Sequence, residues 1–388
     1  MMADSTDAGI GGRVRHARSW QGFTQRELAE MSGVSLSAIR KIEQGTFIPS
    51  LAILRRLSVP LDVHTTELVG VRLPQEPEAG GGIWAPARDA ILAPGRADVV
   101  EADDGIAGSI AAAVRLYHGN RYAELAAVLP RLLADAEGAA PLLRSQAYQL
   151  AGSVMVQTRH REAARVALDR SLADAEATGD EMEAGSAVIT LCWLLIVEGR
   201  FEEVRRLATE WVDRVEPRIS TATVRDLSVW GWLLLRGSAA AVRDNLPHEA
   251  EEMMRLASAA AAATGREQGG YKMYWTTFGP ATVAMKRVEN AVVEGRPDVA
   301  LRLAREVPDG LRPTSDNRNR HLLDVSAAHL DLHHWDDALE VLLRLNDEAG
   351  PWLAEQRMAA GQLRRITRKR RTWTPEMRRL AEVVRLEA

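Results

Sequence analysis

Apolar residues at helical spacing divide residues 14–70 into five short segments, each long enough for two or three helical turns. In the second segment, Thr24 and Glu27 have the spacing of a capping box, so a helix is expected to begin at Thr24. Gly33 then supplies the positive φ that a tight turn between helices needs, and Ser35 can cap the third helix. The pattern therefore predicts a small bundle of five helices.

The orientation of these helices follows from the same spacing. In the second helix, Leu28, Ala29 and Met31 are expected to face the core. The third helix is expected to run to Gln44 and to be closed by Gly45, with a further helix opening at Pro49-Ser50. Its inward residues are Ile39 and Ile42, which leaves on its outer face Leu36, Ser37, Arg40 and Lys41. A proline at position 60 predicts that the fourth helix kinks or ends near Val59.

Several of these residues form a specific pattern, made up of Gly22 to Ala29, Gly33-Val34-Ser35, Ile39, Ile42-Glu43, Gly45 and Pro49-Ser50. The pattern resembles the XRE family of phage-repressor-like helix-turn-helix proteins. The resemblance implies a five-helix lambda-repressor-like DNA-binding domain over residues 12–70 whose third helix enters the major groove of a double-stranded operator. Leu36, Ser37 and Lys41 would then face base edges, with Leu36 placed to contact a thymine methyl group.

The resemblance also implies roles for the residues around this helix. Gln25 would bind phosphate and brace the recognition helix, and Arg40 would contact the DNA backbone. The full set expected at DNA is Thr24, Gln25, Arg26, Ser35, Leu36, Ser37, Arg40 and Lys41. A helical bundle that serves only for dimerisation or docking is the alternative.

Charge along the chain agrees with a nucleic-acid partner for this segment. Residues 11–60 hold eight basic and three acidic side chains, a local charge of +5, although the whole chain carries −4. The remainder therefore carries −9. Such asymmetry is typical of one small module that contacts phosphates joined to a larger body that does not.

Residues 71–105 are rich in proline and glycine and are expected to be a linker, in which only the segment from Trp84 to Leu92 has the spacing of a short helix. From residue 106 to 388 the pattern is helical almost throughout, and it repeats. Each repeat has a turn in which one anchoring residue is followed three positions later by an aliphatic residue or alanine. The anchors are Tyr122, His160, Phe201, Pro247, Pro297 and Trp335, with spacings of 38, 41, 46, 50 and 38 residues.

This arrangement resembles an elongated tetratricopeptide (TPR) array of about six helical hairpins, which implies an all-α superhelix with a concave inner face. The segment 271–280 is rich in aromatic residues and is expected to lie on one inner helix, kinked by Pro280. Together with aromatic residues of preceding helices it could form a ligand pocket. The candidate lining residues are Trp193, Trp230, Trp232, Tyr271, Tyr274, Trp275, Phe278 and His321. For any one of these, packing between repeats is the alternative.

The C-terminal half, through 278–283, 321–324 and 374–376, resembles actinobacterial regulators that join an XRE head to TPR-like repeats. Such regulators are peptide or small-molecule sensors, so the resemblance implies a peptide or small-molecule effector. Residues 364–371 hold six basic side chains, which could contact DNA or pair with acidic residues of the repeats, and pairing is favoured.

Other signals narrow the function class. The single cysteine, Cys192, excludes an internal disulfide, and no export signal or apolar stretch of membrane-spanning length is present, so a cytoplasmic protein without a membrane partner is expected. No catalytic motif is found, and no enzyme activity or cofactor is predicted. His329 and His333 are expected to share a helical face, near Asp336 and Asp337, at a spacing that a metal could use, but such pairs are usually solvated and no metal site is predicted.

The sequence therefore predicts a sequence-specific transcriptional regulator. The repeat region would dimerise, since helix-turn-helix heads read paired half-sites, and would bind an effector that changes operator affinity. The alternative is an interaction adaptor in which the repeats bind a protein partner, for example a sigma or anti-sigma factor, and the head only tethers it.

Overall fold

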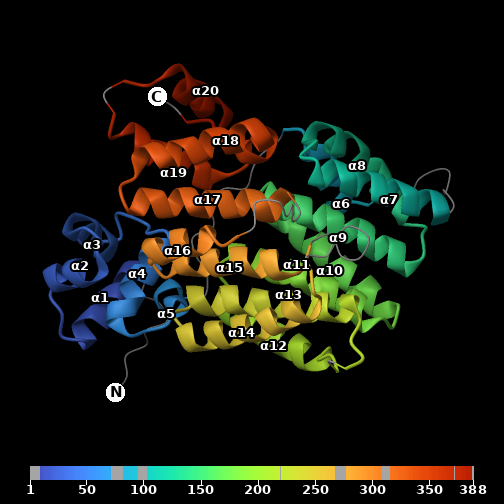
Figure 1. Cartoon of the computed structure of the whole chain (residues 1–388), viewed down its shortest axis with the longest axis horizontal. Coiled ribbons are helices and arrows are strands. Elements are labelled where there is room, and N and C mark those ends of the chain that lie inside the picture. Colours follow the sequence, from blue (N-terminus) through green and yellow to red (C-terminus); the bar gives the residue numbers. More distant parts are fainter. Residues whose placement is uncertain are drawn as a thin grey trace.

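The computed structural model describes residues 9–70, 82–94, 103–218, 220–266, 277–307, 315–370 and 372–386, and these hold twenty α-helices and no strand (Figure 1). The first five helices form the head, which has a core of its own. They are α1 (Ile10–Trp20), α2 (Gln25–Ser32), α3 (Leu36–Glu43), α4 (Leu51–Leu61) and α5 (Thr65–Val69). The described part of the region expected to be a linker, residues 71–105, holds α6 (Ala85–Leu92) and the first three residues of the next helix, which begins at Asp103.

The expected helix boundaries of the head rest on caps that the structure contains. Thr24 accepts a hydrogen bond from the Glu27 amide and forms the capping box of α2, and Ser35 caps α3. Gly33 has a φ of 62° between these helices. The inward placement expected of Met31 is wrong, because its side chain is 54% exposed.

Proline at position 60 lies in the last turn of α4, which ends close to the expected position. The helix continues to Leu61, two residues beyond Val59, and Asp62 then adopts a left-handed conformation. A proline in the last turn removes only one intrahelical hydrogen bond, and the core residues Leu57 and Leu61 on the same helix are fully buried. Burial of this apolar face outweighs the missing bond.

The remaining helices form the array, in which six consecutive hairpins are followed by two further helices. The hairpins are α7 (Asp103–His118) with α8 (Tyr122–Ala136), α9 (Pro141–Gln157) with α10 (Arg161–Ala177), α11 (Glu181–Val197) with α12 (Phe201–Arg214), α13 (Val224–Arg243) with α14 (Pro247–Ala263), α15 (Pro280–Val293) with α16 (Pro297–Ala304), and α17 (Ser315–Asp331) with α18 (Trp335–Ala354). The last two are α19 (Arg357–Thr367) and α20 (Pro375–Val383). The expected TPR-like array of about six hairpins is confirmed.

One turn geometry joins the two helices of every hairpin. Each second helix begins at an expected anchor or, in α10, directly after it. Two residues before each second helix stands a residue with positive φ, namely Asn120, Arg159, Gly199, Asn245, Gly295 and His333. The next backbone N–H then bonds to the carbonyl five residues earlier, as in Arg121 to Leu116 and Arg200 to Leu195. This Schellman-type closure satisfies the end of the first helix and turns the chain back.

Two expectations for the later repeats are wrong. Thr277 to Gly279 are not helical, and Pro280 is the first residue of α15 rather than a kink within a helix, a position that suits a residue without an N–H. His329 and His333 do not share a helical face, because α17 ends at Asp331 and His333 has a φ of 63°.

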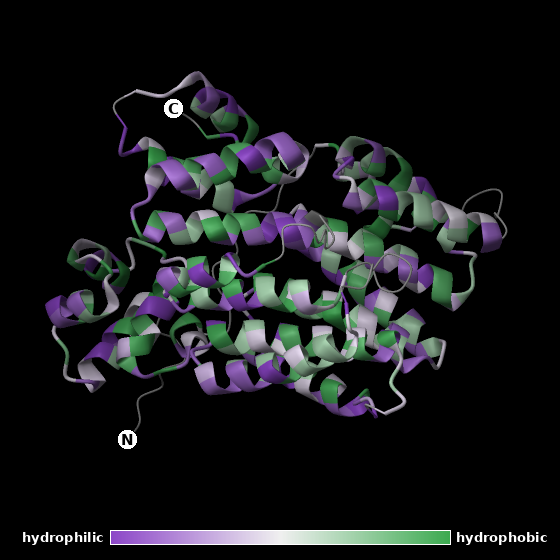
Figure 2. Ribbon diagram, in the orientation of Figure 1, coloured by the Kyte–Doolittle hydropathy of each residue, from purple (hydrophilic) through white to green (hydrophobic). Residues whose placement is uncertain are grey.

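The array curls so that its first and last hairpins lie close together, as α8 and α18 show in Figure 1. Tyr117 on α7 and Asp316 on α17 line the same pocket, and a single hydrophobic core extends from Trp84 to Leu386. Hydrophobic and hydrophilic residues alternate along most helices (Figure 2), as expected for helices that bury one face. The inner helices therefore surround a central space.

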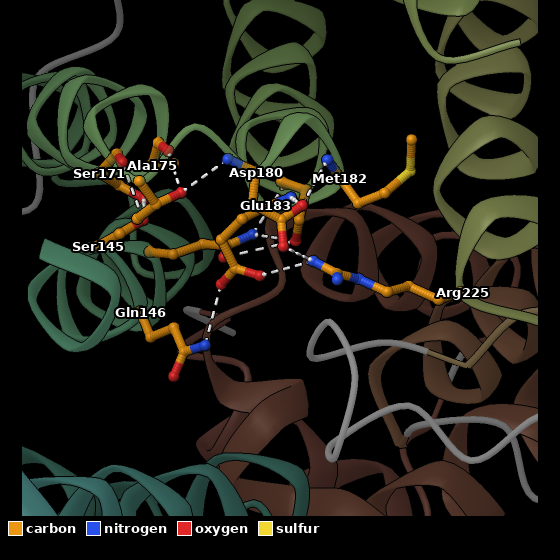
Figure 3. Close-up of polar contacts among 11 residues, drawn as sticks. Ser145, Gln146, Ser171, Ala175, Asp180, Met182, Glu183 and Arg225 are labelled. Carbon is orange, nitrogen blue, oxygen red and sulfur yellow. Dashed lines mark hydrogen bonds and ion pairs between the residues drawn. The ribbon is translucent and has the colours of Figure 1, made fainter.

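Polar contacts also tie neighbouring hairpins together (Figure 3). Asp180 caps α11 by accepting from the amides of Met182 and Glu183, and its other oxygen lies 2.6 Å from Nη2 of Arg225 on α13. Gln146 of α9 donates to Glu183 at 2.9 Å. Burial raises the pKa of Glu183, against the opposing hydrogen bond from Gln146 and the charge of Arg225. Three successive hairpins are thus joined at one end.

Candidate functional site

The exposed face of α3 is the first candidate site. Ser37, Arg40 and Lys41 are exposed on this helix, and Leu36 is half-buried at its first turn. Of the remaining residues expected at DNA, Thr24, Arg26 and Ser35 are exposed and Gln25 is half-buried. Both Thr24 and Ser35 use their side-chain oxygens as helix caps. The expected residues therefore lie at the amino-terminal end of α2 and along α3.

Glu43 is the buried polar centre of the head. Its carboxylate accepts two hydrogen bonds from Arg18, at 2.6 and 3.0 Å, and one from Nε2 of Gln25 at 2.8 Å. Burial raises the pKa of Glu43, but the hydrogen bonds from Arg18 and Gln25 and the charges of Arg18 and Arg15 outweigh it, so the pKa lies below its usual value. Gln25 thus joins α2 to the end of α3.

Most of the basic residues of the head have partners within the protein. Arg13 donates to the carbonyls of Leu68 and Val69, and Arg56 donates to those of Ser32 and Gly33. Arg26 pairs with Glu30, and Arg55 donates a hydrogen bond to the Val242 carbonyl of the array. Among the described residues, Arg40 and Lys41 have no ion-pair partner. The cationic charge that is free to meet phosphate is therefore concentrated on α3.

A central pocket inside the array is the second candidate site. Its cavity volume is about 390 Å³, within the range of about 300–1,000 Å³ of small-molecule sites. Helices α7, α9, α11, α13, α15, α17, α18 and α19 contribute to its wall, and so does Leu51 from α4 of the head. The pocket therefore reaches from the first hairpin to the head.

The pocket wall combines aromatic and charged residues. The aromatic residues include Trp193, Trp232 and Phe278, and the charged residues include Arg236, Lys286 and Glu289. In the same wall, Nε2 of the buried Gln149 donates to the carbonyl and hydroxyl of Ser186 and to the hydroxyl of Thr190. Such a mixture of apolar surface and few fixed polar groups is typical of a ligand site.

Three of the residues expected at a ligand site line this pocket, and two other described residues do not. Trp193, Trp232 and Phe278 line it, with Trp232 donating to the Thr277 carbonyl at 2.9 Å. Trp230 and His321 are buried but are not part of the wall. Burial first, and then the charges of Lys286 and Arg318, lower the pKa of His321 to about 4. The expected residues Tyr271, Tyr274 and Trp275 lie outside the described residues.

The charged residues of the pocket were not anticipated. Arg236, Arg243, Lys286 and Glu289 come from two helices that are nearly fifty residues apart in sequence, so no local motif joins them. One signal was present, since Arg236 directly follows the apolar run from Trp230 to Leu235. An arginine next to such a run needs a buried partner or a cavity.

The head and the array meet at the carboxyl end of α13. Asp244, fully buried, accepts from the Thr66 amide at 3.0 Å and from the Thr66 hydroxyl at 2.8 Å. Its other oxygen lies 3.2 Å from Nη2 of Arg205. Nearby, Arg55 of α4 donates to the Val242 carbonyl at 2.8 Å. Because α13 also carries Arg236, one helix joins the pocket to the head.

Two further clusters lie at the surface of the last hairpin. His329, His334 and Asp337 bring three ligand atoms within 4.8 Å of one another, and the last two side chains are exposed. Burial lowers the pKa of His329, against the opposing charge of Asp337, which favours a neutral ring.

The C-terminal basic segment also meets this hairpin. Arg365 pairs with Asp331 at 2.8 Å, and Arg370 pairs with Asp336. Pairing with acidic residues of the repeats, which the sequence favoured, is thus observed at two of its positions. No helix among the described residues is long and apolar enough to cross a membrane.

Comparison with known proteins places the head in a family. The helix-turn-helix family profile matches residues 14–68. The chain is 34% identical over 62 residues to the HTH-type transcriptional regulator y4aM of Sinorhizobium fredii, an alignment covering 16% of this chain and 43% of y4aM. It is 36% identical over 58 residues to the HTH-type transcriptional regulator YazB of Bacillus subtilis, covering 15% of this chain and 84% of YazB.

Among solved structures, Bacillus thuringiensis PlcR in complex with the peptide PapR7 and DNA aligns with 76% of this chain and 93% of its own, at 13% identity and a TM-score of 0.35. The chain covers less than half of y4aM but most of YazB, and both matches are about as long as the head. With capped helices α2 and α3 in place and an exposed α3 that carries free cations, the chain belongs to the helix-turn-helix family of DNA-binding transcriptional regulators.

Proposed function

We propose that this chain binds a specific operator as a homodimer and that an effector in the central pocket changes its operator affinity. The supporting observation is the position of α13, which carries Trp232 and Arg236 in the pocket wall and Asp244 against the head. A ligand that shifts α13 acts directly on the surface that holds the head. Binding can move an equilibrium only if the ligand favours one of the two arrangements.

The DNA-binding part is assigned to α3. Lys41 and Arg40 supply charge, and Ser37 with Leu36 supplies a hydroxyl and a methyl-contacting surface for base edges. Selection from a random duplex pool provides the operator, and fluorescence anisotropy then measures its affinity against salt concentration. Lys41→Ala is expected to weaken binding by about 1–3 kcal/mol and, if it contacts a phosphate, to lower the salt slope by about 1.

Arg255→Ala is the matched control, because Arg255 is exposed on α14 of the array and its loss removes the same charge. This variant is expected to bind operator as the parent does. If selection yields no preferred sequence and Lys41→Ala leaves the salt slope unchanged, the DNA-binding assignment of α3 is wrong. Recovery of one stoichiometric protein partner under the same conditions would then favour an adaptor.

Dimerisation follows from the way such heads read operators. Two heads bind half-sites about one helical turn apart, roughly 34–36 Å, so one copy would occupy half of a palindrome. Sedimentation equilibrium of the full chain at micromolar concentration, alone and with operator, is expected to give twice the monomer mass. A monomer in both samples contradicts this part of the proposal.

A further inference from the structure

Arg236 is a cation in the pocket wall without an acidic partner. Its Nε donates to the Ile189 carbonyl at 3.1 Å. Among the described residues, Arg236 forms no other hydrogen bond. The guanidinium carbon lies 5.0 Å from the ring centroid of Trp232 and 5.9 Å from that of Trp193. No carboxylate of the described residues forms an ion pair with it, and its two Nη groups have no protein acceptor there. Both Nη groups are therefore available to a ligand.

Glu289, a carboxylate of the described pocket wall, already has two partners. Glu289 accepts from Nζ of Lys286 at 2.8 Å and from Nη2 of Arg243 at 2.5 Å. Burial raises the pKa of Glu289, but the charges of Lys286 and Arg243 hold it well below its usual value. One negative charge is thus shared by two cations, and with Arg236 the cluster keeps a net charge of +2.

Positive charge is also in excess over the whole described wall of the pocket. Its described wall includes six basic residues and three acidic ones. The basic residues are Arg159, Arg236, Arg243, Lys286, Arg320 and Arg357, and the acidic ones are Glu289, Asp316 and Glu355. Clefts lined by one sign of charge concentrate ligands of the opposite sign.

Burial is costly for a charge that lacks a partner. It lowers the pKa of Arg236 to about 10, so the guanidinium is still charged at neutral pH. Removal of an ion from water is offset in proteins by pairing with an opposite charge. An anion that enters the pocket would supply this pairing, and the planar guanidinium fork suits a carboxylate held by two parallel hydrogen bonds.

The apolar surface around Arg236 limits what such an anion can carry. Trp193, Ile189, Ile196 and Phe278 contribute this surface, and the ring of Trp232 lies beside Arg236. A strongly hydrated ion such as sulfate would leave this apolar surface exposed to water. A flat apolar body attached to the anionic group would cover it.

We propose that the central pocket binds an aromatic carboxylate, with the carboxylate on the two Nη groups of Arg236 and the ring system along Trp193 and Trp232. Lys286, whose Nζ lies 5.8 Å from the Trp232 ring centroid, adds positive potential beside it. This inference rests on the proposed effector function, because it names the chemical class of the effector.

Indole-3-acetate and its neutral isostere indole-3-acetamide separate charge from shape, so they are the probes for the full chain in isothermal titration calorimetry. Indole-3-acetate is expected to bind about 10- to 100-fold more tightly than the amide, the range expected for a charge-assisted bidentate pair. Phenyl phosphate is the third probe, and tighter binding of it than of indole-3-acetate would overturn the carboxylate assignment. Equal affinities for acid and amide, or no saturable binding of the acid at millimolar concentration, would also overturn it.

Three variants locate the effect. Arg236→Gln is expected to remove the preference for the acid, Arg236→Lys to keep a reduced preference, and Arg255→Gln, on the surface of α14, to keep it fully. Thermal unfolding by circular dichroism verifies that each variant is folded. If Arg236→Gln does not fold, the acid-to-amide ratio of the parent chain and of Arg236→Lys still decides the proposal. A folded Arg236→Gln that retains the full preference overturns it.

Operator affinity measured with and without indole-3-acetate separates this inference from the proposed function. Acid-selective binding that leaves operator affinity unchanged contradicts coupling between pocket and head, and the ligand class stands. A change in operator affinity produced equally by the amide contradicts the ligand class, and coupling stands.

Discussion

The head and the array use charged residues in opposite ways. In the head, one buried carboxylate, Glu43, collects Arg18 and Gln25, and arginines elsewhere cap backbone carbonyls. In the pocket of the array, cations outnumber carboxylates, and Arg236 lacks an acidic partner among the described residues. The paired charges of Glu43 and Arg18 hold the helices of the head together, whereas Arg236 leaves a positive charge in the pocket that a bound anion would pair.

Loss of the Glu43 carboxylate tests the first half of this contrast and has the largest expected effect. Glu43→Gln leaves the half-buried Arg18 without its anion, which is expected to cost the head about 2–4 kcal/mol. Hydrogen exchange followed by mass spectrometry can assign the lost protection to α1, α2 and α3. Glu30→Gln, which affects an exposed pair with Arg26, is the control and is expected to cost about 0.5 kcal/mol or less. Equal losses in the two variants would contradict a special role for Glu43.

A fall in pH is expected to change the stabilities of the head and the array in opposite directions. The pKa of Glu43 is below its usual value in the fold, so its contribution is complete above about pH 4.3 and is lost as the pH falls through the folded pKa. Burial raises the pKa of Asp316 to about 6, against the hydrogen bond from Tyr117. The folded array therefore binds this proton more tightly than the unfolded chain, and its stability rises as the pH falls from about 7 to 5.

Between pH 7 and pH 5 the expected gain from Asp316 is about 1.4 kcal/mol, because this range extends one unit below the folded pKa and each unit corresponds to about 1.4 kcal/mol. Hydrogen exchange at pH 7 and pH 5, corrected for intrinsic exchange rates, should show increased protection of α17 and little change in α3. Asp316→Asn is expected to reduce the increase, and Asp324 on the same helix, whose pKa burial also raises to about 6, accounts for the remainder. An increase that is undiminished in this variant would contradict the assignment to Asp316.

The contact between the two regions has a smaller expected energy. Asp244→Ala removes the acceptor of the Thr66 amide and hydroxyl and one partner of Arg205. The docking free energy of the head is expected to fall by about 1–2 kcal/mol, since Thr66 and Arg205 can be hydrated once the head moves. Small-angle scattering should report a larger radius of gyration and limited proteolysis a faster cut between head and array. Asp298→Ala, an exposed position on α16, should change neither.

The two regions also differ in how far the sequence predicts them. The caps at Thr24 and Ser35, the turn at Gly33 and the six hairpin anchors are local signals, so helix order and repeat number could be predicted. Met31 was misjudged because its environment depends on packing that spacing alone does not fix.

Residues that meet only after folding could not be predicted in the same way. The pocket brings together Arg236 on α13 and Lys286 on α15, and Asp244 accepts a hydrogen bond from Thr66, which lies 178 positions away in sequence. A periodic pattern tells which face of a helix is buried, but it does not tell which side chain of a distant helix it meets. The aromatic residues Trp193 and Trp232 could be assigned to a pocket because they lie on inner faces of consecutive repeats.

Helix caps give the smallest effect and a direct comparison, because the same motif occurs in both regions. Thr24 caps α2 of the head and Thr223 caps α13 of the array, each with an acidic residue three positions later that completes a capping box. Replacement of either threonine by alanine is expected to cost about 1 kcal/mol. The core of the head is small and that of the array is large, so the same local loss is a greater fraction of the stability of the head. Thr24→Ala should therefore increase exchange throughout α1 to α5, and Thr223→Ala only in the first turns of α13. Exchange that spreads through the array in the second variant would show that the hairpins unfold as one unit with the head.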